Sequence, residues 1–371
     1  MDKNNILFVN LIENKSNSRL YNILKFGFDD KKCTFIETLE EFIAYTVNVN
    51  QNIEKCDFNF LIKVIFAIEL NDGGLNPEYL RFLHAFRSKS IDLSNYVAGI
   101  IVDGKGELYT KSIGREFVFA ANYCGCRFPG RPLVEATGSL HNFNIQANNL
   151  NTDVLSAYRI EVCNLVKRIN DFSAINRENP KLLVLHSAKE SQSNTYTLWS
   201  IVKEKLKNKG IIIQEISLRN GTLQDCGACT YETCLHYGEN DSCFYGGTMV
   251  KEVYPALKKC DGLLLICPNY NDSVSAHIMA VINRMTALYR KVPFWDKELF
   301  AIIVSGYSGS DILAEQLISS LNMNKAFRLP GNFAYMETAN NRGEARAIEG
   351  IEEKMSSFAD IVERTLKGDK N

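Results

Sequence analysis

Four cysteines stand close together in the segment DCGACTYETCLHYGENDSC, residues 225 to 243. Two, four and eight residues separate the successive members Cys226, Cys229, Cys234 and Cys243. Thiolates crowded in this way can hold a 4Fe–4S cluster or a tetrahedral zinc ion, because both accept four sulfur ligands from one flexible loop. His236 could replace one thiolate at a zinc site, and Cys226 with Cys229 could instead act as a redox dithiol. The segment leaves these alternatives open.

The other cysteines show no such spacing. The chain has eleven cysteines, and its N-terminus carries no apolar export signal. We therefore expect a reducing, cytoplasmic environment rather than a disulfide framework. Cys124 and Cys126 form no pattern with a partner. Apolar contexts predict small buried side chains for Cys33, Cys56, Cys163, Cys260 and Cys267.

Composition excludes several classes of protein. The 371 residues are 46% hydrophobic and 23% charged, with a formal net charge of -1. Such a balance gives no electrostatic reason to expect a nucleic acid or an acidic membrane as a partner. The longest apolar runs, such as GLLLIC and FAIIV, have the length of a strand and are too short to span a bilayer.

The two halves of the chain resemble each other. Residues 6–24 (ILFVNLIENKSNSRLYNIL) lie over 183–201 (LVLHSAKESQSNTYTLWSI) without a gap, at an offset of 177. Three further pairs of blocks follow in the same order, namely 64–74 with 264–274, 85–106 with 288–309, and 127–138 with 328–339. We predict a tandem duplication with its boundary near 176–181, giving a first unit at 1–176 and a second at 181–371.

Each half alternates apolar strands with amphipathic helices. This pattern predicts a doubly wound parallel sheet covered by helices on both faces, so the expected fold is two tandem α/β units of three layers. Ligands of such sheets bind beyond the carboxyl ends of the strands. Between the first and second pairs of blocks the offset grows by 23 residues, from 177 to 200. The second half therefore carries an insertion, and the cysteine segment, at about 222–247, falls in that interval.

Three loops after predicted strands of the second half carry groups that suit a ligand. The first loop, HSAKESQSNTYTL, opens a helix, where free N–H groups and the helix dipole favour a phosphate. An ordinary Ser/Asn helix cap is the alternative. Hydroxyls, an amide and one cation come from Ser187, Lys189, Ser191, Ser193, Asn194 and Thr195.

The second and third loops suit a flat aromatic ligand. The second loop lies in CPNYNDSVSAHIMAVINR (267–284), where Pro268 stiffens the turn and Tyr270 offers an aromatic face. Its hydrogen-bonding groups come from Asn269, Asn271 and Ser273. In the third loop, SGYSGSD, glycines let the backbone approach a ligand closely; the loop contains Gly306, Tyr307, Ser308 and Gly309. Together the three loops suit flavin mononucleotide (FMN), although tight turns alone would use similar residues.

These loops resemble the NADPH-dependent FMN reductase branch of the flavodoxin-like proteins, over about residues 180 to 365. That family has a Gly-Ser-x-Arg-x-x-x-Asn-Thr loop and a Pro-x-Tyr-x-x-Ser loop leading into a helix that ends Asp-Arg. This chain has His186-Ser187, Lys189 and Asn194-Thr195, then Pro268, Tyr270, Ser273 and Asn283-Arg284. The resemblance implies that the FMN phosphate is held by Ser187, Lys189, Ser193, Asn194 and Thr195. It implies that Pro268 to Ser273 and Gly306 to Gly309 flank the isoalloxazine ring.

The first half lacks this equipment. Ile12, Ile68 and Leu70 stand where the second half has Lys189, Pro268 and Tyr270. We expect no flavin there. Because reductases of this family generally pair so that a neighbour helps to enclose the flavin, the first half is expected to act as a built-in partner, and a homo-oligomer stays open.

The cysteine segment resembles that of the iron–sulfur flavoproteins within the same family. Their spacing is Cys-x2-Cys-x2-Cys-x4–7-Cys in the same region of the fold, whereas here the second gap has four residues and the last has eight. The resemblance implies an FMN-dependent oxidoreductase that moves electrons between NAD(P)H or ferredoxin and an acceptor, through the cluster if it is present. No side chain is assigned as catalytic. The alternative is a non-catalytic scaffold with a zinc-stapled loop.

Overall fold

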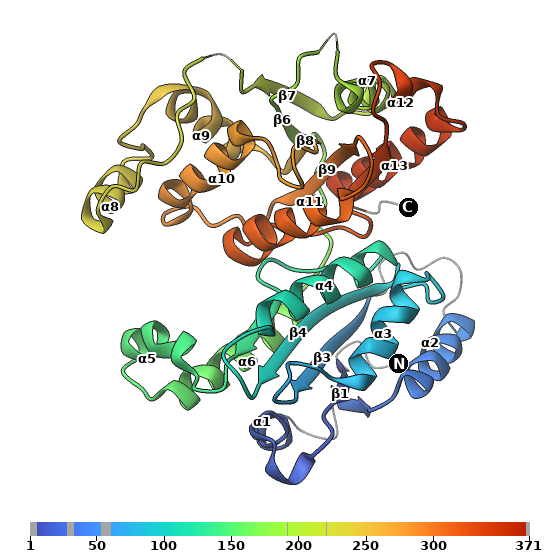
Figure 1. Ribbon diagram of the computed structural model, residues 1–371, viewed down its shortest axis with the longest axis vertical. Helices are drawn as coiled ribbons and strands as arrows, with labels where there is room; N and C mark the ends of the chain where they lie inside the picture. Colours follow the sequence, from blue (N-terminus) through green and yellow to red (C-terminus); the bar gives the residue numbers. More distant parts are fainter. Residues whose placement is uncertain (1–5, 28–32, 53–60, 191, 220, 369–371) are drawn as a thin grey trace. The chain divides into compact units, whose positions relative to one another are not determined.

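The computed structural model describes residues 6–27, 33–52, 61–190, 192–219 and 221–368. The chain divides into two compact units between Ser173 and Ala174 (Figure 1). The division falls slightly before the predicted boundary. Arg177 already belongs to the second unit, where its guanidinium lies 3.1 Å from a carboxylate oxygen of Asp261. None of the described helices combines the length and the apolar composition that crossing a bilayer requires.

The first unit is built around one parallel sheet with strand order β2-β1-β3-β4-β5. Its strands are β1 (Ile6–Leu11), β2 (Cys33–Ile36), β3 (Ile62–Leu70), β4 (Tyr96–Gly104) and β5 (Leu133–Ala136). Its helices are α1 (Arg19–Gly27), α2 (Leu39–Asn52), α3 (Pro77–Arg87), α4 (Thr110–Tyr123), α5 (Asn144–Leu150) and α6 (Val154–Asn170).

The second unit repeats this topology with the order β7-β6-β8-β9-β10. Its strands are β6 (Lys181–His186), β7 (Ile212–Ser217), β8 (Gly262–Pro268), β9 (Glu298–Ser305) and β10 (Ala334–Thr338). Its helices are α7 (Asn194–Leu206), α8 (Tyr231–Glu239), α9 (Tyr254–Lys259), α10 (Ala276–Tyr289), α11 (Ser310–Leu317), α12 (Glu344–Ala347) and α13 (Ile351–Lys367). The order 2-1-3-4-5 in both units is that of flavodoxin-like sheets, so the predicted fold class is confirmed.

The sheet registers locate the inserted residues. In the first unit Ile6 lies beside Lys63, 57 positions later, and in the second unit Leu183 lies beside Leu263, 80 positions later. The difference is the 23 residues expected from the sequence. In the second unit this interval contains α8, a π-helical turn at Met249–Val253 and α9, whereas the first unit has α2 there.

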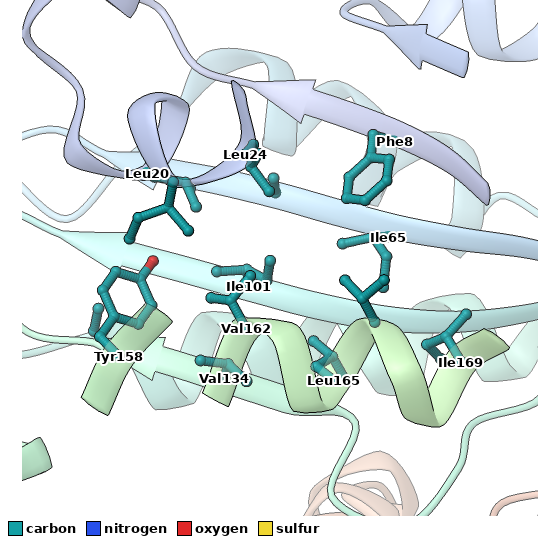
Figure 2. Packing of buried hydrophobic residues seen from close by; sticks show 14 of the residues in the cluster. Phe8, Leu20, Leu24, Ile65, Ile101, Val134, Tyr158, Val162, Leu165 and Ile169 are labelled. Atoms are coloured by element: carbon teal, nitrogen blue, oxygen red, sulfur yellow. The ribbon is translucent and has the colours of Figure 1, made fainter. Parts of the chain in front are cut away.

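Apolar side chains fill both faces of each sheet. In β3, Ile65 packs on one face with helices α1 and α6, and Figure 2 shows it near Phe8, Leu165 and Ile169. The next residue, Phe66, points to the opposite face and contacts aromatic rings from α3 and α4. Strands β4 and β9 are buried along their whole length, which explains why their sequences are apolar except near the ends, where Asp103, Glu298 and Ser305 lie.

The predicted burial of isolated cysteines is only partly correct. Cys260 and Cys267 are buried, and burial raises the pKa of the Cys260 thiol to about 12. Cys33 is half-buried. Cys163 is exposed, contrary to the prediction, because it lies on the outer side of α6, where periodicity and not residue type decides which side chains face the core. Cys56 lies outside the described residues.

Candidate functional site

The three predicted loops lie at one edge of the second sheet. They follow β6, β8 and β9, which are neighbouring parallel strands, so their carboxyl ends meet. The first two loops are joined by a buried hydrogen bond of 2.7 Å between the hydroxyls of Ser187 and Ser275. The second and third are joined by the side-chain amide of Asn269, which donates to Ser305 Oγ at 3.0 Å and to the Ser308 carbonyl at 3.1 Å. The loops thus form one hydrogen-bonded unit.

The first loop ends in a capped helix. The Ser193 hydroxyl accepts a hydrogen bond of 3.2 Å from the Tyr196 amide, so Ser193 is the N-cap of α7. The Lys189 carbonyl accepts from the amides of Gln192 and Ser193, which makes the loop turn tightly before the helix. Lys189 is exposed and Thr195 is buried. A cap, a nearby cation and the N-terminus of a 13-residue helix suit a phosphate. Ser191 lies outside the described residues.

Asn194 is already engaged by the protein. Its amide nitrogen donates to the carbonyls of Ala339 and Asn341, at 3.2 and 2.8 Å. Its amide oxygen accepts from the backbone N–H groups of Gly343 and Ala345, at 3.0 and 3.4 Å. Asn194 therefore ties the start of α7 to the loop after β10. These contacts fix the end of the first loop, where α7 begins.

The second loop is a tight turn that presents an aromatic ring. Tyr270 and Ser273 exchange backbone hydrogen bonds of 3.1 and 3.2 Å. Between them Asn271 and Asp272 both have left-handed φ angles, 53° and 54°, which Asn and Asp tolerate better than most residues. The turn leaves the Tyr270 side chain 54% exposed, as a face on which a planar ligand could lie.

Asn269 holds an unpaired acceptor at the centre of the loops. Its nitrogen has three partners, the third being Asp272 Oδ1 at 3.2 Å. Its Oδ1 atom is buried and has no hydrogen-bond partner among the described residues. A buried acceptor without a donor is costly. The flavin ring carries an imide N–H donor of the kind this atom lacks, so the residues present fit the group.

The third loop depends on Gly309. This residue has φ 87°, and a Cβ atom there would lie 2.3 Å from Asp272 Oδ1 and 3.1 Å from Asn269 Nδ2. Glycine therefore allows the second and third loops to approach each other. Tyr307 is 84% exposed, and Gly306 lies against the Asn340 side chain.

The four cysteines occupy a surface segment around α8. Cys226 is exposed, Cys229 and Cys234 are half-buried, and Cys243 is buried. Burial raises the pKa of the Cys234 thiol, and the neighbouring thiols of Cys229 and Cys243 act in the same direction. The Cys234 thiol therefore lies near those of Cys229 and Cys243. In the described part of the chain no three of these sulfur atoms lie within 4.8 Å of one another.

Helix α10 anchors this segment, which the sequence did not indicate. Arg284 donates to the carbonyls of Gln224 and Gly246, at 3.1 and 2.6 Å, and so holds both ends of the segment. Asn283 donates to Asp225 at 3.1 Å. Gly238 of α8 lies so close to α10 that a Cβ atom there would be 2.6 Å from the Ala287 carbonyl oxygen.

A second polar cluster, also missed, lies beneath the first loop. His186, Glu190 and Glu215 each place a ligand-type atom within 4.8 Å of the others. Burial lowers the pKa of His186, which favours its neutral form. Glu215 already accepts hydrogen bonds from three side chains, at 2.7, 3.1 and 2.8 Å, namely those of Tyr196, Trp199 and Lys203. We interpret the cluster as a bridge between α7 and β7, and not as a metal site.

The same edge of the first sheet has a different character. Glu69 at the end of β3 and Asp103 at the end of β4 lie side by side in the sheet. The second unit has Asn269 and Ser305 in these positions. Arg19 Nε donates to both carboxylate oxygens of Asp103, at 3.0 and 2.9 Å. Burial raises the pKa of Glu69, and the charge of Asp103 raises it further. When ionised, the Glu69 carboxylate opposes the binding of an anionic cofactor, whereas the charge of Asp103 is balanced by Arg19.

Comparison with known proteins finds one matching family and one similar curated protein. The family model described as NADPH-dependent FMN reductase matches residues 180–341. A protein named iron-sulfur flavoprotein from Archaeoglobus fulgidus is 26% identical over 166 residues, which are 44% of this chain and 82% of that protein.

Solved structures similar to this chain cover about half of it. The NAD(P)H:quinone oxidoreductase from Methanothermobacter marburgensis aligns with a TM-score of 0.37 and 15% identity, over 51% of this chain and 99% of its own. An azoreductase from Bacillus anthracis aligns with a TM-score of 0.34 and 14% identity, over 50% of this chain and 98% of its own.

Proposed function

We propose that the second unit, which the NADPH-dependent FMN reductase model matches over residues 180–341, binds one FMN in its three linked loops and passes electrons from NAD(P)H or ferredoxin to an acceptor. One observation carries the proposal. The buried Ser187–Ser275 bond and the Asn269 amide join the loops that match the family's motifs, and this network leaves an unpaired acceptor at its centre. The flavin when bound supplies the hydride and single-electron chemistry.

The residues of this chain have three tasks in the proposal. Ser187, Lys189 and the capped start of α7, with Ser193 and Thr195, hold the phosphate. The turn from Pro268 to Ser273 and the loop from Gly306 to Gly309 enclose the ring, with Tyr270 on its face. Asn194 keeps the first loop in place through its four backbone contacts. No side chain is needed as an acid or base.

The cysteine segment is proposed to hold a 4Fe–4S cluster. Cys234 already lies near Cys229 and Cys243. Cys226 is on the exposed, non-helical stretch before α8, from which it could join them as the fourth ligand. The named iron-sulfur flavoprotein among the relatives favours iron over zinc. The cluster would relay electrons singly between the flavin and the acceptor.

The first unit is proposed to be a duplicated copy that has lost flavin binding. The shared strand order and the 23-residue insertion support the duplication. Glu69 places a carboxyl group at the edge where the second unit has the neutral Asn269, and the neighbouring Asp103 is occupied by Arg19.

We therefore expect one FMN per chain and not two, because only one of the two sheet edges carries the binding loops. The protein should be purified without oxygen, and the flavin released on denaturation should be compared with the protein concentration. Stepwise addition of NADPH should bleach the flavin absorbance. Two flavins per chain would refute the assignment of the first unit, and a colourless protein that does not take up FMN would refute the function.

Replacing Cys243, the most buried of the four thiols, should remove the metal. We expect Cys243→Ser to lose most of the iron and sulfide and to retain FMN, because the flavin loops do not use this residue. The exposed Cys163→Ser in the first unit is the matched control and should keep both. The measurement is iron, sulfide, zinc and flavin per chain after anaerobic purification. Zinc in place of iron would show that the segment is a structural zinc site and not a cluster site. A full complement of iron in Cys243→Ser would refute the assignment of Cys243 as a ligand.

A further inference from the structure

His186 is a buried imidazole at the point where the first loop leaves the sheet. It is the last residue of β6 and is 1% exposed. The Tyr196 ring packs on it, with 5.1 Å between the ring centroids. Its Nε2 atom lies 3.5 Å from Glu215 Oε1, and its Nδ1 atom has no hydrogen-bond partner among the described residues. A neutral imidazole therefore leaves one buried nitrogen unpaired, which is costly.

Charged groups face His186 from three elements. Glu190 of the first loop and Glu215 of β7 each place a carboxylate oxygen within 4.8 Å of an imidazole nitrogen. Lys203 of α7 pairs with Glu215 at 2.8 Å. Burial has the largest influence on the pKa of His186 and lowers it, and Lys203 acts in the same direction. The two carboxylates and the Ala188 backbone oppose this change and favour the protonated imidazole.

This cluster lies directly under the loop that is proposed to bind the phosphate. Ala188 and Glu190 belong to the loop, and both act on the imidazole. While His186 is neutral, the two carboxylates and the one ammonium group of Lys203 leave an excess of one negative charge. Protonation of His186 cancels that excess. A phosphate above the cluster is opposed by the first charge state and not by the second.

We propose that His186 is a positioning residue whose protonation draws Glu190 against the edge of the sheet and so tightens the binding of the FMN phosphate. This inference rests on the FMN site of the proposed function. A protonated imidazole has two N–H donors, so it can keep its contact with Glu215 and also engage its unpaired nitrogen. It attracts the Glu190 carboxylate, and the loop's own negative charge is then balanced beneath the phosphate. His186 itself need not touch the flavin.

The FMN affinity should therefore depend on pH in one direction. Binding favours the protonated imidazole, so the pKa of His186 is higher in the complex than in the free protein. The added affinity is complete below the free-protein pKa and is lost as the pH rises to the pKa of the complex. Because burial lowers the free-protein pKa, the loss begins below the ordinary value for histidine.

Two substitutions test the imidazole and the loop carboxylate separately. His186→Gln keeps an N–H group that can face Glu215 but cannot be protonated. Glu190→Gln removes the charge of the loop at an exposed position, where the core is not disturbed. The matched controls are His84→Gln, at an exposed histidine of the first unit, and Glu204→Gln, at an exposed glutamate of α7 that pairs with Lys207 at 3.3 Å.

The measurement is a titration of each flavin-free protein with FMN, followed by flavin fluorescence, from about pH 5 to about pH 8. The FMN phosphate itself ionises near about pH 6, but it does so equally for every variant, so wild type and variants are compared at the same pH. We expect wild type to bind about tenfold more tightly than His186→Gln in acid, the effect of a pKa difference of about one. The two proteins should bind equally at the alkaline end.

The loop variant should show the complementary pattern. Glu190→Gln should bind FMN more tightly than wild type at the alkaline end and equally in acid, where the charge that it removes is already balanced. His84→Gln and Glu204→Gln should follow wild type at every pH, because their charges are screened by water.

Two outcomes would overturn the inference. The first is a constant ratio between the dissociation constants of wild type and His186→Gln at every pH, which would make the imidazole a packing group only. The second is a Glu190→Gln profile that coincides with that of Glu204→Gln, and this comparison decides alone if His186→Gln does not fold. A wild-type protein that binds no FMN at any pH refutes the proposed function itself. That result is recognised before any variant is compared, so the two failures are distinguishable.

Discussion

Gly309→Ala is expected to weaken FMN binding roughly 10- to 100-fold, by about 1–3 kcal/mol of overpacking. The added methyl group would lie 2.3 Å from Asp272 Oδ1, so the turn from Tyr270 to Ser273 must move away. The movement also disturbs Asn269, whose nitrogen would be 3.1 Å from the same methyl group. Both loops that are proposed to enclose the flavin ring then lose their fit. The measurement is a titration of the flavin-free protein with FMN, followed by flavin fluorescence.

Gly210→Ala is the control for this result. Gly210 also has a left-handed φ, 67°, but the nearest atom to an added Cβ, Asn179 Oδ1, is 4.0 Å away. It lies between α7 and β7, at the opposite edge of the sheet from the loops. Both substitutions therefore introduce the same backbone strain, about 1–2 kcal/mol. Only Gly309→Ala should change the FMN dissociation constant, and equal effects of the two variants would contradict the role of the third loop.

Arg19→Met is expected to lower the free energy of unfolding of the first unit by about 3 kcal/mol at neutral pH. The substitution leaves the Asp103 carboxylate, whose side chain is 5% exposed, without its cation. We place the effect at the lower end for a broken buried pair because the Arg19 side chain is 28% exposed. Both tryptophans, Trp199 and Trp295, belong to the second unit. Circular dichroism should therefore show an earlier unfolding transition that tryptophan fluorescence does not follow.

The loss in Arg19→Met should depend on pH. Burial raises the pKa of Asp103, and Arg19 opposes that rise, so removing Arg19 raises this pKa further. A carboxyl group whose pKa is higher in the folded than in the unfolded state favours folding at low pH. That contribution is lost as the pH rises from the unfolded pKa to the folded pKa. The destabilisation should therefore be small in acid and full at neutral pH.

Two further variants test the cause. Arg19→Met combined with Asp103→Asn should recover most of the lost stability, since no buried charge remains. Arg81→Met removes an exposed arginine that pairs with Glu78 at 3.1 Å, and it should leave the unfolding midpoint unchanged. A loss in Arg81→Met as large as in Arg19→Met, or no recovery in the double variant, would contradict the role of the buried pair.

The fold could be predicted because its signals are local. Strand-length apolar runs such as β4 and β9 alternate with helices whose caps stand next to them in the chain, as Asn76 and Ser193 do. The similarity between the two halves also predicted a 23-residue insertion in the second, which the sheet registers reproduce. The sheet registers make Val97 of the first unit equivalent to Leu299 of the second. The gap-free sequence match of 85–106 with 288–309 aligns these strands one residue away from that register. Sequence similarity alone cannot detect an alignment error of one residue between two apolar strands.

The three loops could be located from the sequence because each follows a strand, and parallel strands bring their carboxyl ends together. Residue types at single positions also indicated the cysteine segment and the loss of ligand groups in the first half. The contacts that join these parts depend on pairs distant in the chain, such as Ser187 with Ser275 and Arg284 with Gln224 and Gly246. No local pattern carries such pairs, because a side chain's partner is set by how the helices pack on the sheet. For the same reason Asn194 was expected to face a phosphate, whereas packing directs its amide to the loop after β10.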